Sequence, residues 1–342
     1  MITSDIYGKL EDGREVRRFT IANKKGEYVQ ILEYGAIIHS IVVLDRDGRL
    51  DDVCLGCASG ERIEGFGRAG RVIGRVANRI KRGRFTIGDR KFKLKCNEGR
   101  NFLHGADDDY GKKLWSGRIE GESVVLTYMD NDTVGFGCGV AAQVRYRFDD
   151  MSRLTIEYEF TAQGDTVINP TNHAYFDLSG TGDVRDHDLW IGAAYRVHRD
   201  EEGIPDGGLV PVKGTAADFT YLRCVREAMK YSGDYFGNGP VSYDEFYLLD
   251  RQESGKPVAD LYSYNVGRGM RTYTDMPAMV LYTDPGTKTE TGKNGRELGA
   301  YCGICLETGF VPNAVNLPEF ASPVVMEGAA LRSTTVYEFY TR

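Results

Sequence analysis

Short strand-like segments dominate the sequence, and this pattern restricts the fold more than any other feature. Leu154–Phe160 and Thr335–Tyr340 alternate apolar and polar residues, as a strand with one buried face does. Ala36–Leu44 is too apolar to alternate, which is typical of a strand buried on both faces. The best helical candidate is the short stretch Tyr221–Tyr231. The pattern predicts an all-β fold, a large antiparallel β-sandwich with few short helices.

The composition supports this fold class. The 342 residues include 42 Gly, 21 Tyr and 15 Phe but only 10 Pro. Aromatic side chains pack well on pleated sheets, and Gly permits tight turns. Gly88–Arg90 separates the strand-like segments Arg84–Ile87 and Lys91–Leu94, which predicts a hairpin. Because no linker, low-complexity tract or internal repeat divides the chain, we expect residues 1–342 to form a single domain.

Charge and cysteine content narrow the range of partners. The formal net charge is −7 at pH 7, and an acidic chain without a basic tail is a poor partner for nucleic acid or an anionic membrane. No apolar run approaches the roughly 20 residues of a membrane span, and no signal-peptide pattern is visible. Seven Cys suit free thiols in a reducing compartment. We expect a cytoplasmic monomer or weak homodimer that binds a small molecule.

Two Cys-x-x-Cys pairs, Cys54/Cys57 and Cys302/Cys305, are the only spacing in the sequence that is typical of a zinc site. Both lie in strand-like runs, where residues three apart point to opposite faces and cannot bind one ion. Free Cys is also among the most buried residue types. We therefore expect buried thiols and no metal.

Two histidines and one glutamate are the candidates for acid–base chemistry. His104 and His173 each stand among amide and aromatic residues, the mixture that lines sugar sites. Glu307 closes an apolar run, where burial can tune the pKa of a carboxylate. Considered singly, each of these residues suits a structural role in the core or in an ion pair as well as a catalytic one.

The densest basic stretch is Arg68–Arg84. A solvated face or a weak anion site is the usual interpretation of such a charge run. Asn78 and Arg79 lie between apolar neighbours, so one guanidinium could instead point inward and bind hydroxyl groups. No glycine-rich phosphate loop follows a strand, so we expect no nucleotide cofactor.

A set of short motifs follows one another in a specific order. They are Gly74–Ile80, Gly83–Phe85, Asn97, Asn101–Gly105, Lys112–Trp115, Asn169–Gly180, Glu202–Gly207, Gly214–Phe219, Glu307–Gly309, Pro312–Pro318 and Arg332–Tyr337. In this order and spacing the chain resembles the galactose mutarotases, the aldose 1-epimerase family, over about residues 14–340. Each motif alone is weak, but the ordered set is specific.

The resemblance implies a β-supersandwich fold and an enzyme that interconverts the α and β anomers of a free aldose, with no cofactor. It implies that His173 is the general acid and Glu307 the general base. It further implies sugar-binding roles, with His104 beside the ring oxygen, for Asn78, Arg79, His104 and Asp244.

The chain departs from the family pattern at Glu245, Val280, Gly309 and Phe310. We expect these positions to lie near the residues that contact the sugar. A polar contact replaced by an apolar one changes which hydroxyl groups can be matched, since an unpaired buried hydroxyl costs about 1–3 kcal/mol. The reaction is therefore better specified than the sugar.

Two alternatives stay open at this point. One is a carbohydrate-binding or sensing protein that kept the fold but lost turnover. The other is an epimerase for a phosphorylated hexose, in which the basic stretch Arg68–Arg84 holds the phosphate.

Overall fold

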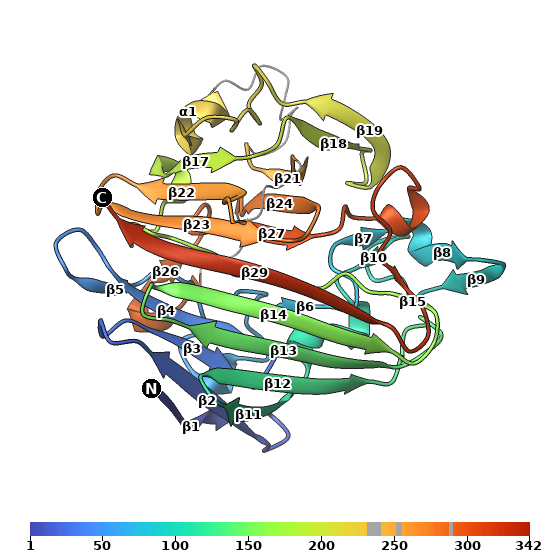
Figure 1. Cartoon of the computed structure of the whole chain (residues 1–342), viewed down its shortest axis with the longest axis horizontal. Coiled ribbons are helices and arrows are strands. Elements are labelled where there is room, and N and C mark those ends of the chain that lie inside the picture. The colour runs from blue at the N-terminus through green and yellow to red at the C-terminus, as the bar shows by residue number, and fades with distance from the viewer. Residues whose placement is uncertain (231–240, 251–254, 287–289) are drawn as a thin grey trace.

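In the computed structural model, which describes residues 1–230, 241–250, 255–286 and 290–342, a nine-stranded antiparallel sheet crosses the molecule (Figure 1). In spatial order its strands are β11 (Ser116–Glu120), β12 (Ser123–Asp130), β13 (Val140–Phe148), β14 (Arg153–Ala162), β29 (Ala330–Thr341), β23 (Arg268–Thr274), β22 (Ala259–Ser263), β17 (Asp188–Ile191) and β20 (Arg223–Cys224).

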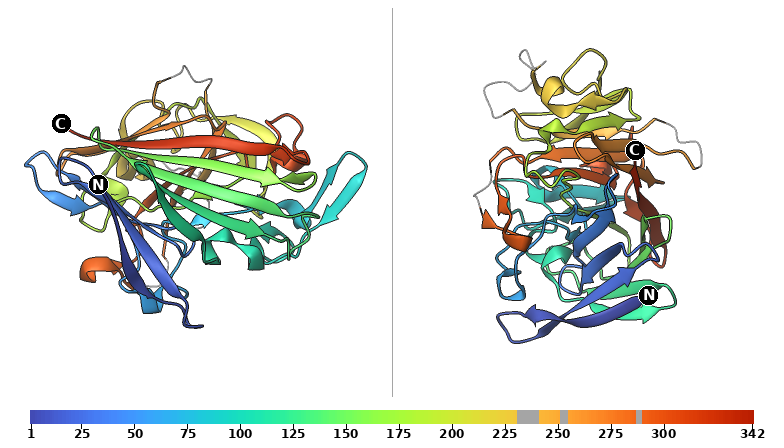
Figure 2. Two further views of the ribbon diagram at one scale, coloured as in Figure 1. Left: turned by 60° about the horizontal axis from the view of Figure 1, so that its bottom comes forward. Right: turned by 90° about the vertical axis from the view of Figure 1, so that its left-hand side faces the viewer.

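Two five-stranded antiparallel sheets accompany the large one. The first contains β1 (Ile2–Lys9), β2 (Glu15–Ala22), β3 (Tyr28–Leu32), β4 (Ile38–Leu44) and β5 (Leu50–Asp52). The second, in spatial order, contains β19 (Pro205–Pro211), β18 (Tyr195–Arg199), β21 (Asp244–Leu248), β24 (Ala278–Thr283) and β27 (Ile304–Gly309). The views in Figure 2 place both chain termini toward the same end of the large sheet.

Among the residues that the structure describes, five short two-stranded antiparallel sheets lie in the connections between strands of these larger sheets. They are β6 (Val72–Ile73) with β16 (Thr171–Asn172), β7 (Arg79–Ile80) with β10 (Phe102–Leu103), β8 (Arg84–Ile87) with β9 (Arg90–Lys93), β15 (Thr166–Val167) with β28 (Val324–Val325), and β25 (Glu290–Thr291) with β26 (Glu297–Leu298). The described residues contain one α-helix, α1 (Val225–Lys230), and seven 3-10 turns at Gly60–Arg62, Lys81–Gly83, Ala106–Asp108, Tyr110–Lys112, Val184–Asp186, Lys293–Gly295 and Ala314–Asn316. None of these helical segments has the length and apolar character needed to span a membrane.

The strand predictions are confirmed. β14 and β29 contain the two alternating segments, and β4 is buried at every residue except Leu44. The predicted hairpin is formed by β8 and β9. The predicted helix begins later than expected, at Val225, because Arg223 and Cys224 pair with β17 as a strand. Its predicted last residue, Tyr231, lies outside the described residues.

The sheet containing β21, β24 and β27 has two faces with different roles. Neighbouring strand residues point to opposite faces. Leu281 and Leu306 are buried in the main core. On that side the Tyr337 hydroxyl of β29 donates to the Leu306 carbonyl over 3.1 Å. The side chains that alternate with Leu281 and Leu306, including Glu307, lie on the opposite face. That face is turned toward the loops after β6, β10 and β16.

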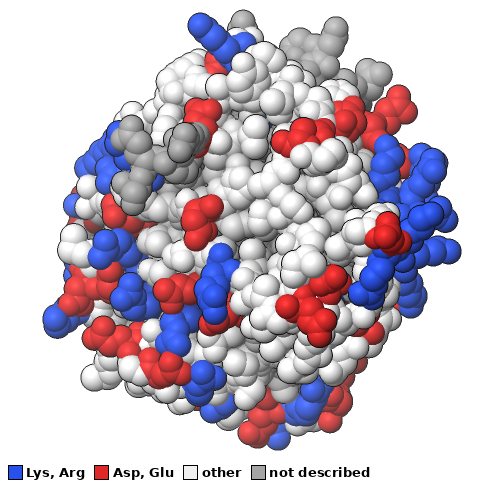
Figure 3. Space-filling view, turned by 45° about the vertical axis from the view of Figure 1, so that its right-hand side comes forward, with Lys and Arg blue, Asp and Glu red and all other residues white. Residues whose placement is uncertain are grey.

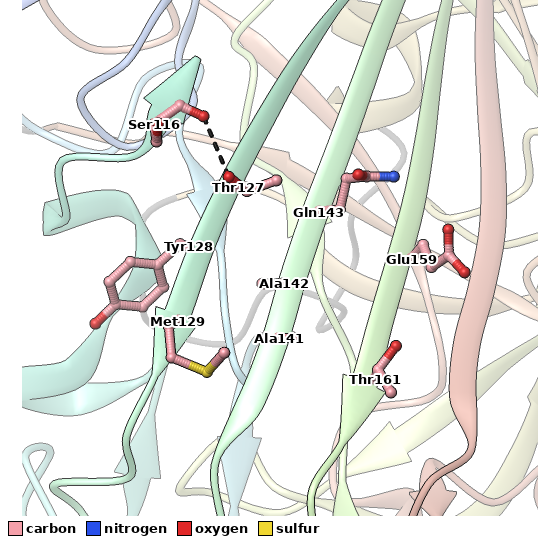
Figure 4. A pocket seen from close by; sticks show the side chains of 9 residues that line it. All are labelled: Ser116, Thr127, Tyr128, Met129, Ala141, Ala142, Gln143, Glu159 and Thr161. Carbon is pink, nitrogen blue, oxygen red and sulfur yellow. Dashed lines mark hydrogen bonds between the residues drawn. The ribbon is translucent and has the colours of Figure 1, made fainter. Parts of the chain in front are cut away.

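The outer side of the large sheet is hollowed as well. A hollow of about 470 Å³ lies over β12, β13 and β14, with Thr127, Gln143, Glu159 and Thr161 on its floor (Figure 4). Glu159 is the one charged residue that lines it. The described residues that line this hollow include no imidazole–carboxylate pair, whereas Glu307 lies on β27 of the five-stranded sheet that also contains β21 and β24.

Candidate active site

Glu307 is held rigidly on a buried strand. All six residues of β27 are buried, and the strand pairs with β24 so that Glu307 lies opposite Val280. The neighbouring Thr308 hydroxyl lies 2.6 Å from the Thr335 hydroxyl of β29. Together with the pairing to β24, this contact fixes the backbone at Glu307, a residue that is only 5% exposed.

His173 reaches Glu307 from a different part of the chain. It follows β16, and β16 pairs with β6. Backbone hydrogen bonds fix both of its peptide groups: its N–H donates to the Arg71 carbonyl and its carbonyl accepts from Gly70 N, each over 2.9 Å. The His173 Nε2 atom lies 3.6 Å from Glu307 Oε1, and His173 is also 5% exposed. The structure therefore brings the two residues of the expected acid–base pair into direct contact.

Asn78 and His104 form a reciprocal pair beside His173. Asn78 N–H donates to His104 Nδ1 over 3.1 Å, and His104 N–H donates to the Asn78 carbonyl over 3.1 Å. Both residues have positive φ angles, 59° and 49°, an uncommon conformation that these mutual bonds hold. Because Nδ1 accepts, the proton of the neutral His104 ring sits on Nε2. The His104 ring lies edge-on to His173, with 5.9 Å between ring centroids.

Arg79 and Asp244 complete the expected group. Arg79 Nε and Nη2 donate to the two Glu98 carboxylate oxygens over 2.6 and 2.7 Å. Its Nη1 atom lies 3.8 Å from Asp244 Oδ2, to which Arg199 Nη1 also donates over 3.2 Å. Arg79 is thus oriented by one carboxylate while its remaining donors face another. The structure brings together all six residues singled out by the family resemblance.

Glu245 lies in a different place from the one we expected. On β21 it alternates with Asp244 and so points to the opposite face, where it is 3% exposed. Its carboxylate accepts from Arg196 Nη1 over 3.3 Å and from Arg199 Nη2 over 3.2 Å. This departure from the family pattern supports Arg199 behind Asp244 and does not face Glu307.

The other departures do surround Glu307. Val280, Gly309 and Phe310 line a small hollow that also contains Glu307. Gly309 has a packing reason, since a Cβ there would come within 2.9 Å of the Asn169 side-chain oxygen. That oxygen accepts from Phe310 N–H over 2.9 Å and so anchors the turn after β27. Val280 places an apolar wall against the carboxylate.

Burial moves the pKa values of the pair in opposite directions. Burial, with the nearby Asp244 charge adding to it, raises the pKa of Glu307 to about 8. Burial, with the Arg68 charge adding to it, lowers the pKa of His173 to about 4. Burial also lowers the pKa of His104 well below its usual range, so this ring stays neutral. Between pH 4 and 8 the His173–Glu307 pair therefore holds one proton.

The basic stretch is used for structure rather than for a single anion site. Arg75 is buried and its Nε donates to Asp130 over 2.8 Å. Arg71 Nη2 donates to two backbone carbonyls, and Lys81 Nζ lies 3.1 Å from Asp200. Figure 3 shows basic side chains on both flanks of the visible face, mixed with acidic ones, while its centre carries few charges.

Three residues beside His173 were not recognised in the sequence. Cys305 Sγ lies 3.5 Å from His173 Nδ1, so this thiol is buried against the imidazole and not merely in the core. The Tyr175 ring stacks on the His173 ring at 5.0 Å, and the Tyr282 ring meets it edge-on at 6.1 Å. Two signals in the sequence could have identified two of these residues. Tyr175 belongs to the motif Asn169–Gly180, and Cys305 precedes Glu307 by two positions, on the same strand face.

Two further histidines have partners away from Glu307, and the cysteines are free thiols. His187 Nε2 accepts from Leu178 N–H, and His198 pairs with Asp206. Within the described residues, which include all seven cysteines, no disulfide is present. The same residues contain no group of three or more His, Cys, Asp or Glu side chains placed to hold a metal ion.

Comparisons with known proteins agree on one family. The family described as Aldose 1-epimerase matches residues 17–338. Galactose mutarotase of Sus scrofa is 33% identical over 99% of this chain and 98% of its own length. Aldose 1-epimerase of Escherichia coli (strain K12) is 32% identical over 96% of each chain.

Solved structures show the same relationship. An aldose epimerase homologue from C. elegans superposes with a TM-score of 0.87 at 26% identity, over 94% of this chain and 98% of that one. Galactose 1-epimerase from Lactobacillus acidophilus superposes with a TM-score of 0.84 at 25% identity, over 100% and 99% of the two chains. The fold, the match over nearly the whole sequence and the relatives together show that this chain belongs to the aldose 1-epimerase family of isomerases.

Proposed function

We propose that this protein is a mutarotase that interconverts the α and β anomers of a free aldose, with Glu307 as general base and His173 as general acid. The observation that carries the proposal is the buried contact of 3.6 Å between His173 Nε2 and Glu307 Oε1. Family membership supports the reaction class.

The geometry suits the two proton transfers that the reaction needs. The C1 hydroxyl and the ring oxygen of an aldose are bonded to the same carbon, so the base and the acid that serve them must lie close together. Glu307 removes the proton of the C1 hydroxyl, and the electrons of that O–H bond form the C1 carbonyl. The bond between C1 and the ring oxygen breaks, and the ring oxygen takes a proton from His173.

Reclosure reverses these steps after the C1–C2 bond has rotated. The aldehyde then presents its other face to the former ring oxygen, and the proton transfers run backward. Glu307 and His173 end in the protonation states in which they began. The reaction therefore needs no external proton and no electron acceptor.

The resting site must rearrange one proton before it can act. The pKa values place that proton on Glu307 in the free enzyme. A bound C1 hydroxyl that donates to Glu307 stabilises the ionised carboxylate. Ring opening therefore proceeds from the arrangement in which the proton is on His173. The apolar Val280 wall keeps the transferred proton within the pair by excluding water.

The other four residues would bind the sugar or hold a residue that binds it. His104 Nε2–H is a neutral donor beside His173, suited to the ring oxygen as charge develops there. Asp244 accepts from sugar hydroxyls, and Arg79 presents donors next to it. Asn78 fixes His104 through the reciprocal bonds described above.

The structure weighs against both alternatives that the sequence left open. A pure binding protein does not require a buried imidazole and carboxylate in contact, and burying such a pair adds little to the stability of the fold. For the phosphate alternative, Arg75, Arg79 and Lys81 each have a carboxylate partner within the chain. The charges of these three residues are therefore already matched, and they do not form a free cluster for a phosphate.

A mutarotation panel tests the proposal. Freshly dissolved α-glucose, α-galactose, L-arabinose and D-xylose are followed by polarimetry with and without the protein. We expect at least one of them to reach anomeric equilibrium faster than in buffer alone. Sugar binding measured by calorimetry without any acceleration would instead favour the non-catalytic alternative, and a preference for glucose 6-phosphate over glucose would favour the phosphate alternative.

The pH dependence should show two limbs. We expect kcat/KM to be level between about pH 4 and 8 and to fall on both sides, because the active pair holds one proton. Below about pH 4 the pair gains a second proton and Glu307 cannot act as base. Above about pH 8 the pair loses its proton and His173 cannot act as acid. Initial rates across this range check the profile, and a rate independent of pH from 3 to 10 would contradict it.

Cys305 should act as a positioning residue for His173. Burial raises the pKa of its thiol well above the usual range, so it stays protonated beside Nδ1. Cys305→Ala is expected to lower kcat by about three- to tenfold with little change in KM, the size of one modest hydrogen bond. It should also move the acid limb of the pH profile.

Cys305→Ser supplies the matched control for this prediction. A hydroxyl can form the same contact with Nδ1, so the serine variant should recover most of kcat and the original acid limb. A merely structural role would appear as a lower melting temperature in both variants with unchanged limbs, and that outcome would rule out positioning.

A further inference from the structure

A second hollow, of about 350 Å³, adjoins the acid side of the site. Tyr175 and Tyr282, whose rings contact the His173 ring, form the wall that it shares with the site. Phe66 and Leu298 add apolar surface, while Arg68 and Asp284 are among its charged residues. None of the six residues assigned above to the reaction or to the sugar lines this hollow.

Strand pairing fixes the order of these features. Val280 lies opposite Glu307, and Tyr282 lies opposite Cys305. Residues two apart on a strand share a face, so Glu307 and Cys305 lie next to each other on one face of the sheet. Cys305 contacts His173. The hollow, with Asp284 and Cys302 in its lining, lies beyond Cys305 in the direction away from Glu307. Along the sheet, the base Glu307 therefore comes first, the acid His173 second and the hollow third.

This order corresponds to an order of atoms in the sugar, an argument that rests on the proposed function. The base contacts the C1 hydroxyl, and the acid contacts the ring oxygen. The next ring atom after the ring oxygen is C5, which carries the exocyclic C6 in a hexopyranose. The hollow beyond the acid therefore faces the C6 side of the bound sugar.

The hollow has more room than the exocyclic group of a single hexose would fill. A water-sized group occupies about 30 Å³, so the hydroxymethyl group of C6 would leave most of the 350 Å³ empty. The volume lies within the range of small-molecule pockets, about 300–1,000 Å³. It is suited to a further ring attached through O6.

The lining favours a neutral ring over a phosphate. Arg68, Arg71 and Lys112 are balanced in part by Glu64 and Asp284, and Arg71 is already bonded to backbone carbonyls. A phosphate would face two carboxylates. A sugar ring has hydroxyls that can bond both signs of charge and an apolar face that can lie on an aromatic wall.

We propose that this hollow binds a second sugar unit linked through O6 of the aldose that anomerises, so that reducing 1→6-linked disaccharides are favoured substrates. Phe66, Leu298 and the two tyrosines hold the apolar face of the second ring. Arg68 and Asp284 bond its hydroxyls.

The test compares sugars with the same reducing end. Mutarotation of glucose, isomaltose, maltose and glucose 6-phosphate is followed by NMR of the anomeric protons, each against its rate in buffer. We expect kcat/KM for isomaltose to exceed that for glucose and for maltose by about tenfold, the scale of discrimination that pocket contacts give. An isomaltose value no higher than that of glucose or maltose overturns the proposal, and so does a preference for glucose 6-phosphate.

A space-filling variant tests the location. Leu298→Trp should reduce the isomaltose-to-glucose ratio of kcat/KM to about one, because the indole occupies the hollow. Leu50→Trp, the same substitution on the exposed surface of β5, should leave the ratio unchanged. An undiminished ratio in Leu298→Trp overturns the location. If that variant does not fold, Leu298→Phe carries the same expectation.

The failure of this inference differs from that of the proposed function. If glucose is accelerated but isomaltose is not favoured, only the second-unit site is wrong. If no sugar is accelerated at all, the mutarotase proposal itself fails.

Discussion

Replacing Glu307 by glutamine is expected to lower kcat for anomer interconversion by about 10³- to 10⁴-fold, the upper range for loss of a general base. Glutamine has nearly the same shape and can still hydrogen-bond the C1 hydroxyl, but it cannot take its proton. Substrate binding should therefore change little. Anomer exchange measured by NMR at substrate saturation gives kcat directly, and KM from the same series shows whether binding is kept.

The stability of this variant provides its control. The pKa of Glu307 is about 8 in the folded protein against 4.5 as its ordinary value. Between these values the unfolded chain has released a proton that the folded chain retains, so wild-type stability falls as the pH rises from about 4.5 to 8. Glutamine does not titrate, so the variant does not lose this stability as the pH rises. The variant should melt above the wild type at pH 8 and close to it at pH 4.5, which would show that lost activity is not lost structure.

Replacing His173 by asparagine is expected to lower kcat by about 10²- to 10³-fold. Asparagine can still donate a hydrogen bond toward the ring oxygen, but it cannot transfer a proton there, and water must supply it. The alkaline limb of the pH profile should disappear, since that limb reports loss of the proton that His173 donates, while the rate should still fall where Glu307 becomes protonated. Rates between pH 3 and 10 check both parts.

A surface histidine offers the matched control. His198 is exposed and pairs with Asp206 away from Glu307, so His198→Asn should keep the wild-type rate and pH profile. Retention of both in His173→Asn as well would rule out His173 as the acid, and Glu307 would then need another proton donor.

Much of the fold could be predicted from the sequence because strand periodicity is a local signal. The alternating segment in β14 and the continuous apolar run in β4 each identify a strand without knowledge of its partner. The helix boundary could not be predicted in the same way. Whether Arg223 and Cys224 begin a helix or extend a sheet depends on β17, which is distant in the sequence.

The candidate site could likewise be predicted from the sequence only in part. The ordered motifs identified His173 and Glu307 as a pair, although 134 positions separate them along the sequence numbering. The side on which a neighbour points is not contained in a motif, so Glu245 was expected near the sugar while strand alternation turns it away. The contact of Cys305 with His173 and the hollow beyond Tyr175 arise only when β16 is packed against β27.

The most direct test of the central claim is a single series of NMR exchange measurements on the anomeric protons. Wild type, Glu307→Gln, His173→Asn and the double variant are compared with buffer on the sugar that the panel identifies as the best substrate. Because the two residues act as a unit, we expect the double variant to be no slower than about the slower single variant. Wild type should exceed all three by at least about 10²-fold. Equal rates in wild type and Glu307→Gln would contradict the assignment of Glu307 as the base.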